Sequence, residues 1–109
     1  MTTSSHVALV GRLGARVRSQ TLPSGDVVTS FTVVIDRPTR EQSGGAHAVT
    51  VDAISCITTR ARARSQVERL EPGTVVEVEG TLRRRFWRGG GSSAVGSAME
   101  VVVRSIRKA

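Results

Sequence analysis

The chain has 109 residues, enough for one domain with a modest hydrophobic core and too few for two. Sixteen lysines and arginines against nine aspartates and glutamates give a net charge of +7, which favours an anionic partner, most commonly nucleic acid. A single cysteine excludes an intrachain disulfide, and no apolar stretch approaches the roughly 20 residues of a membrane-spanning helix, so we expect one cytoplasmic domain over residues 1–109.

The N-terminal third predicts two strands joined by a turn. Apolar residues alternate over residues 7–13, and the strand pattern resumes as far as Val17. Residues 22–26 contain a proline and a glycine spaced for a tight reversal. A second strand is predicted from residue 27 to about residue 36, with Phe31 facing the core.

The middle of the chain predicts a loop, a strand and a helix. Residues 37–45 are polar and contain proline and glycine, which interrupt regular structure and indicate an exposed loop. Residues 48–57 are rich in β-branched residues, which indicates a third strand. Cys56 lies in that apolar run, where a buried structural thiol is expected. Residues 58–70 suit a short amphipathic helix, capped by Thr58 or Thr59 and stopped by the proline and glycine that follow.

The last third predicts a long fourth strand over residues 74–88, a flexible loop to about residue 97, and a fifth strand over residues 98–106. Five strands with one helix between the third and fourth is the element order of an OB-fold, although other small barrels share such pieces. We therefore expect an all-β fold, a five-stranded OB-fold barrel with one short α-helix between strands 3 and 4.

The most informative motif is the run Arg83-Arg84-Arg85-Phe86-Trp87 near the end of the fourth strand. Because side chains alternate along a strand, Arg83, Arg85 and Trp87 share one face. The other face, with Leu82 and Phe86 in line with Val76 and Val78, is predicted to be core. By the same alternation, Arg84 falls on the face predicted to be core. It should therefore lie where the strand has left the barrel, or extend its guanidinium group to solvent.

Guanidinium groups beside an indole match what single-stranded nucleic acid presents, namely phosphates and flat bases. Arg83, Arg85 and Trp87 are therefore the central candidates for binding, although a lone tryptophan is more often a core residue. Arg12, Arg16 and Arg18 extend the basic track, with a plain solvated charge as an equal alternative for each.

Nothing in the sequence points to catalysis or metal binding. His6 and His47 have no ligand spacing to Cys56, and no Ser-His-Asp arrangement suggests itself. We expect no enzyme activity, no cofactor and no metal site.

Several segments resemble the bacterial single-stranded DNA-binding protein family: VALVGRLG at residues 7–14, LPSGD at 22–26, SFTV at 30–33, VEVEGTLRRRFW at 76–87 and EVVV at 100–103. The resemblance covers almost the whole chain in order. It implies an OB-fold that assembles as a homotetramer and wraps single-stranded DNA, independently of sequence, by stacking and phosphate contacts. The implied roles are DNA replication, recombination and repair in the bacterial cytoplasm, in association with the nucleoid.

The chain departs from this family at three positions that usually carry stacking aromatics, where it has Thr39, Val51 and Ile57. Each stacked base is worth about 1–3 kcal/mol, so their loss weakens the expected binding. The sequence ends at Ala109 on a basic note, so we expect neither the family's acidic C-terminal tail nor tail-mediated recruitment of repair enzymes.

These departures leave two alternatives open. A tailless, aromatic-poor chain also resembles primosomal replication protein B, a dimeric relative, and would then be an accessory or structural OB-fold module with weak nucleic-acid binding and mainly protein partners. RNA is a further possible ligand, because stacking platforms discriminate poorly between single strands.

Overall fold

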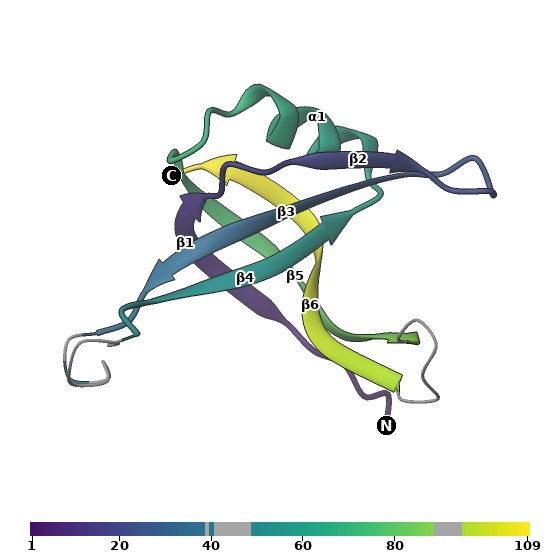
Figure 1. Ribbon diagram of the computed structural model, residues 1–109, viewed down its shortest axis with the longest axis horizontal. Coiled ribbons are helices and arrows are strands. Elements are labelled where there is room, and N and C mark those ends of the chain that lie inside the picture. Colours follow the sequence, from purple (N-terminus) through teal and green to yellow (C-terminus); the bar gives the residue numbers. More distant parts are fainter. Residues whose placement is uncertain (39, 41–48, 89–94) are drawn as a thin grey trace.

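The structure is a computed structural model that describes residues 1–38, 40, 49–88 and 95–109 (Figure 1). Seven elements make up the fold of these residues. In chain order they are β1 (Val7–Leu13), β2 (Arg18–Thr21), β3 (Val27–Asp36), β4 (Val51–Thr58), α1 (Ala61–Arg69), β5 (Val75–Arg88) and β6 (Val95–Lys108). The predicted strands and helix are confirmed, except that residues 14–17, which were expected to continue the first strand, are not in a strand. The sequence missed that β2 is a strand of its own, paired with β3 from Arg18↔Ser30 to Thr21↔Val27.

Element boundaries differ from the prediction by a few residues. The fifth predicted strand starts earlier and ends later, as β6, and the third predicted strand is β4, which extends to Thr58. Most of the predicted loop at residues 37–45, and the glycine-rich part of the later loop, lie outside the described residues. Among the described residues, no helix is long and apolar enough to cross a membrane.

The strands form one curled sheet in the order β1-β5-β6-β4-β3-β2. All neighbours are antiparallel except β4 and β6, which pair in parallel at Cys56↔Val101 and Ile57↔Val102. The last two residues of β1, Arg12 and Leu13, pair with β3 while Arg12 still pairs with Val75 of β5, which brings the two sides of the sheet together. Gly11 sits at this crossing, where an added Cβ would lie 2.5 Å from the Val34 carbonyl oxygen, so the crossing requires glycine.

The core lies inside the curled sheet and under α1. Its fully buried side chains alternate along the strands, as period-two patterns predict, and include Leu13, Val33, Val76, Val78, Val101 and Val103. The helix contributes Ala63 and Val67 to this core and lies across the C-terminal end of β6 (Figure 1).

The predicted cap of α1 is wrong. The helix begins after Arg60, and no side chain caps it. Thr58 still belongs to β4 and is buried, where its hydroxyl donates to the Val103 carbonyl (2.9 Å) and accepts from the Arg60 N–H (3.3 Å). Its hydroxyl therefore joins the end of β4 to β6 instead of capping the helix.

The second half of β5 also differs from the prediction. Leu82 and Phe86 were expected in the core, but they are 45% and 64% exposed. The reason is that β1 accompanies β5 only as far as Gly80, so beyond that point β6 is the one described strand that pairs with β5, and a single hydrogen bond from the Leu82 N–H to the Ser5 hydroxyl (3.0 Å) lies on the other edge. We call residues 81–88 and 95–102 the β5–β6 arm; its far end projects away from the barrel in Figure 1.

Arg84 agrees with the expectation for a residue beyond the barrel. Its side chain is exposed, and Nη1 donates a hydrogen bond to the Ser97 hydroxyl across the arm (3.2 Å).

Candidate nucleic-acid interface

Trp87 lies on the surface of the β5–β6 arm. The indole is 45% exposed, and the Cζ of Arg85 lies 5.1 Å from the ring centroid, a cation–π geometry. Gly96 is directly opposite on β6, and a Cβ there would come within 2.5 Å of the indole Cε2. The glycine thus lets the indole lie against the backbone of β6, while almost half of the side-chain surface stays open to a base.

Glu100 ties together the two arginines that share a face with Trp87. The carboxylate is only 4% exposed, accepts a hydrogen bond from Nη2 of Arg83 (2.8 Å) and lies 3.7 Å from Nε of Arg85. A buried carboxylate is costly unless it is paired, so the two guanidinium groups compensate its burial. The three groups together carry one net positive charge rather than two.

The sequence reasoning gave Glu100 no role, although a signal for it exists. In the antiparallel pairing of β5 and β6, Arg83 lies directly opposite Glu100, and opposite charges at such positions attract. The pairing of Glu100 with Arg83 depends on the register of β5 and β6, which cannot be read from the sequence of either strand alone.

Next to this arm, the outer faces of β3 and β4 form a hollow of about 340 Å³, which we call the β3–β4 hollow. Arg16 and Arg18 reach it from the β1–β2 side, and Arg85 reaches it from the arm. Arg16 and Arg18 form no ion pair with any residue that the structure describes. The other residues that line the β3–β4 hollow are Ser30, Phe31, Thr32, Ser55, Cys56, Ile57 and Glu100.

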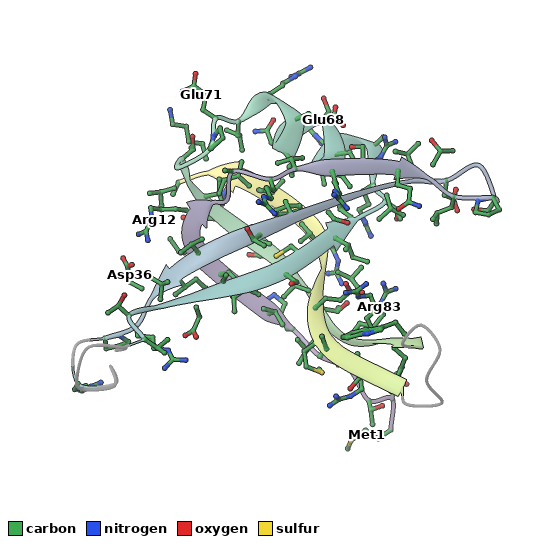
Figure 2. All side chains as sticks on the ribbon, in the orientation of Figure 1. Met1, Arg12, Asp36, Glu68, Glu71 and Arg83 are labelled. Atoms are coloured by element: carbon green, nitrogen blue, oxygen red, sulfur yellow. The ribbon has the colours of Figure 1, made fainter. Side chains whose placement is uncertain are left out.

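Arg12, also predicted from the sequence to extend the basic track, is not part of this hollow. Both terminal nitrogens of its guanidinium donate to the carboxylate of Asp36, at 3.0 Å each. These hydrogen bonds, and the charge of the guanidinium, hold the pKa of Asp36 below its usual value. In Figure 2, Arg12 and Asp36 lie together on the side of the barrel away from Arg83. The structure therefore brings together Arg16, Arg18 and Arg85, with the exposed Arg83 paired to the buried Glu100 beside them, and leaves Arg12 outside.

The hollow has an aliphatic rather than an aromatic lining at the positions singled out in the sequence. Ile57 lines it, and Val51 lies exposed on the same face of β4, while Thr39 is outside the described residues. Phe31 belongs to the core, as predicted, and is 3% exposed. A base on β4 would thus find apolar contact but no ring on which to stack.

Cys56 lies beneath the hollow and is buried, as predicted. Burial, with a smaller contribution from the charge of Glu100, raises the pKa of its thiol to about 12. The side chain is therefore a neutral packing group at neutral pH. Within the described part of the chain, no three His, Cys, Asp or Glu side chains gather in a way that could hold a metal ion.

The comparisons with known proteins agree with this architecture. Residues 4–108 match the single-strand binding protein family. The single-stranded DNA-binding protein A of Bacillus subtilis is 35% identical over 81 residues, which is 74% of this chain and 45% of that protein. The single-stranded DNA-binding protein of Oceanobacillus iheyensis is 30% identical over 103 residues, which is 94% of this chain and 62% of that protein.

The chain thus spans about half the length of the curated relatives it matches. Among solved structures, the Plasmodium falciparum SSB complex with ssDNA superposes with a TM-score of 0.74, covering 98% of this chain and 94% of that one at 18% identity. The structural likeness confirms the predicted OB-fold. The family match confirms the resemblance seen in the sequence: the chain belongs to the single-strand binding protein family.

Proposed function

We propose that this protein binds single-stranded DNA without sequence preference, through the β5–β6 arm and the β3–β4 hollow, in replication, recombination or repair. The observation that carries the proposal is the half-exposed Trp87 with Arg85 against its ring, next to a hollow that Arg16 and Arg18 line. The relatives are named for single-stranded DNA binding, and the similar solved structure is a complex with ssDNA. No part of the proposal requires catalysis.

In this proposal, the indole of Trp87 stacks on one base, and the guanidinium groups hold the adjacent phosphates. Arginine suits this task because its planar group pairs bidentately with phosphate and also stacks on rings. Ile57 and Val51 offer further bases only apolar contact. Phosphate contacts therefore supply an unusually large share of the binding energy, and affinity will depend steeply on salt.

The test is a fluorescence titration, which is simple because Trp87 is the only tryptophan of the chain. Oligo(dT) will quench its emission, duplex DNA of equal length will quench it much less, and added salt will weaken the binding. Absence of both quenching and a mobility shift at micromolar protein and low salt would refute the proposal. Competition between oligo(dT) and oligo(U) will separate DNA from RNA as the preferred strand.

We further propose that the protein forms a homo-oligomer, a tetramer, with a dimer as the alternative. Residues 7–11 of β1 pair with β5 on one edge, and no strand among the described residues pairs with their other edge, a common template for another chain. Val10 on this strand is 60% exposed, and Leu82, Phe86 and Met99 are exposed together on the arm face opposite Trp87. Sedimentation equilibrium at micromolar concentration will report the mass, and a monomer would refute this part.

The aliphatic residues Val51 and Ile57, at positions of β4 where a stacking aromatic was expected, favour one alternative function, that of an accessory module with weak DNA binding and mainly protein partners. The discriminating measurement is a pull-down with an Arg16→Glu/Arg18→Glu variant. Retention of a protein partner by this variant, after nuclease treatment, would support the accessory role over the DNA-binding one.

A further inference from the structure

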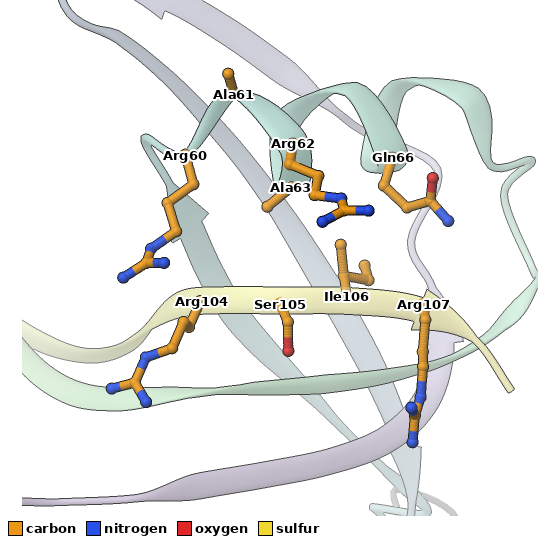
Figure 3. Close-up of a pocket in the computed structure, with 9 residues that line it drawn as sticks. All are labelled: Arg60, Ala61, Arg62, Ala63, Gln66, Arg104, Ser105, Ile106 and Arg107. Atoms are coloured by element: carbon orange, nitrogen blue, oxygen red, sulfur yellow. The ribbon is translucent and has the colours of Figure 1, made fainter.

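A second basic depression in the surface is lined by residues outside the motif at residues 83–87. It is a groove of about 970 Å³ between α1 and the C-terminal part of β6, which we call the α1–β6 groove. Figure 3 shows Arg60 and Arg62 reaching from the start of the helix toward β6, while Ile106 points back toward the helix. Arg104, on β6, lines the same groove.

The charges of this groove are not compensated. Arg60, Arg62 and Arg104 form no side-chain hydrogen bond or ion pair with any residue that the structure describes, and none of the groove's described lining residues is acidic. Arg107 at the end of the groove differs, because its guanidinium contacts Glu77 at 2.6 Å. The three unpaired arginines repel one another, so an anion between them would stabilise the site.

A β-bulge places Arg104 in the groove. Gly80 pairs with Val103 and Glu79 with Ser105, so Arg104 is the extra residue on β6. Bulges re-aim the side chain of the extra residue. Gly80 makes this possible, since an added Cβ would collide with the carbonyl oxygen of Val102. The presentation of Arg104 is thus built into the backbone of both strands.

The groove lies near the β3–β4 hollow. Ile57 lines the hollow and pairs with Val102 of β6. Arg60 follows Ile57 by three residues and Arg104 follows Val102 by two, so at about 3.3 Å per residue the backbones of these two arginines lie within about 10 Å of that pair. None of the described residues that line the groove is aromatic, and its helix side carries the small residues Ala61 and Ala63. It therefore suits a sugar–phosphate backbone better than a stacked base.

Given the proposed function, we infer that the α1–β6 groove is a second phosphate-binding subsite, which holds the same single strand after it leaves the β3–β4 hollow. Arg60, Arg62 and Arg104 contact the phosphates, and the bases face outward. The alternative occupant, an acidic segment of another protein, is one outcome of the test.

The test compares Arg62→Gln/Arg104→Gln with a control of equal charge change, Arg69→Gln/Lys108→Gln. The control residues are exposed and do not line the groove. Both variants are titrated with a short oligo(dT), of a length that just saturates Trp87 quenching, and with one several times longer. Each titration is repeated at several salt concentrations, and circular dichroism checks that both variants are folded.

The expected result is a loss confined to the groove variant and the long strand. Each phosphate contact on a single strand contributes about 0.7 to the salt slope, so losing two lowers the slope by about 1.4. From about 50 to about 200 mM salt, the wild type then loses about sevenfold more affinity than the groove variant. The short oligonucleotide should bind both variants as it binds the wild type.

Equal behaviour of the groove and control variants on the long strand would overturn the inference, while Trp87 quenching in the wild type would leave the proposed function standing. If poly-glutamate binds the wild type but not the groove variant, and the long-strand slope is unchanged, the groove belongs to an acidic protein segment and the inference is likewise overturned. Failure of the proposed function would show differently, as no binding of either oligonucleotide to the wild type.

Discussion

Replacing Glu100 by glutamine will tighten single-stranded DNA binding, because the carboxylate competes with phosphate for the two arginines of the arm. Glu100 contacts Arg83 at 2.8 Å and Arg85 at 3.7 Å. A glutamine has nearly the same shape, and its carbonyl oxygen still accepts a hydrogen bond from Arg83. The substitution therefore removes a negative charge and leaves the packing in place.

The magnitude follows from Coulomb's law. A phosphate bound on the far side of either guanidinium would lie about 8 Å from the carboxylate, where the repulsion is about 2 kcal/mol at an effective dielectric constant of about 20. Screening at about 0.15 M salt reduces it to about 0.8 kcal/mol, or about fourfold in affinity. The salt slope should steepen by about 0.7, because one more arginine is available to a phosphate.

The assay is fluorescence anisotropy of a labelled short oligo(dT) over a range of salt concentrations. Glu77→Gln is the matched control, since it also removes a carboxylate paired with an arginine, Arg107, but away from the arm. Glu100→Gln should also lower the free energy of unfolding by about 1 kcal/mol, which denaturant unfolding will show. Weaker DNA binding, or an unchanged salt slope, would mean that Glu100 holds the arginines in place for DNA rather than competing with it.

Three further predictions concern single side chains. Trp87→Ala should weaken binding to oligo(dT) and oligo(dC) alike, by about 1–3 kcal/mol in anisotropy titrations, and an unchanged affinity would remove stacking from the proposal. Gly96→Ala should shift the emission maximum of Trp87 and weaken oligo(dT) binding, because the added Cβ meets the indole at 2.5 Å; identical spectra would contradict the packing described. Cys56 should contribute to the pH dependence of stability: its pKa rises from 9.0 to about 12 on folding, so above about pH 9 the unfolded state loses the proton first and stability falls with pH. Comparing denaturant unfolding of the wild type and Cys56→Ala from about pH 8 to about pH 10.5 should therefore show the stability difference shrinking, whereas a constant difference would contradict the raised pKa.

The alternation of apolar residues was sufficient to predict the core-facing residues in the first half of β5. Val76 and Val78 are buried as expected, because that part of β5 has β1 on one side, β6 on the other and the core beneath. The same alternation places Leu82 and Phe86 on one face but does not reveal whether anything covers that face. Coverage depends on where the neighbouring strand ends, and here β1 accompanies β5 no further than Gly80.

The candidate site was predicted in part. Arg83, Arg85 and Trp87 could be chosen from the sequence of β5 by itself, since alternation along a strand is a local property. Glu100 and Arg104 could not, because their roles depend on which residues of β6 lie opposite β5 and on the bulge at Arg104. The pairing of Arg12 could not be predicted for the same reason: its partner, Asp36, lies 24 residues further along the chain, on β3.

The course of β5 through two environments has a consequence for local stability. Up to Gly80 it pairs with β1 and β6 over the packed core, whereas beyond Gly80 it pairs with β6 and its side chains from Leu82 to Trp87 are exposed. Such a segment can open without unfolding the rest of the protein. Amide hydrogen exchange should therefore change sharply along this one strand, slow at Val76 and Val78 and fast at Arg83 and Arg85. The arm could then adjust to a bound strand while the barrel that carries it stays folded.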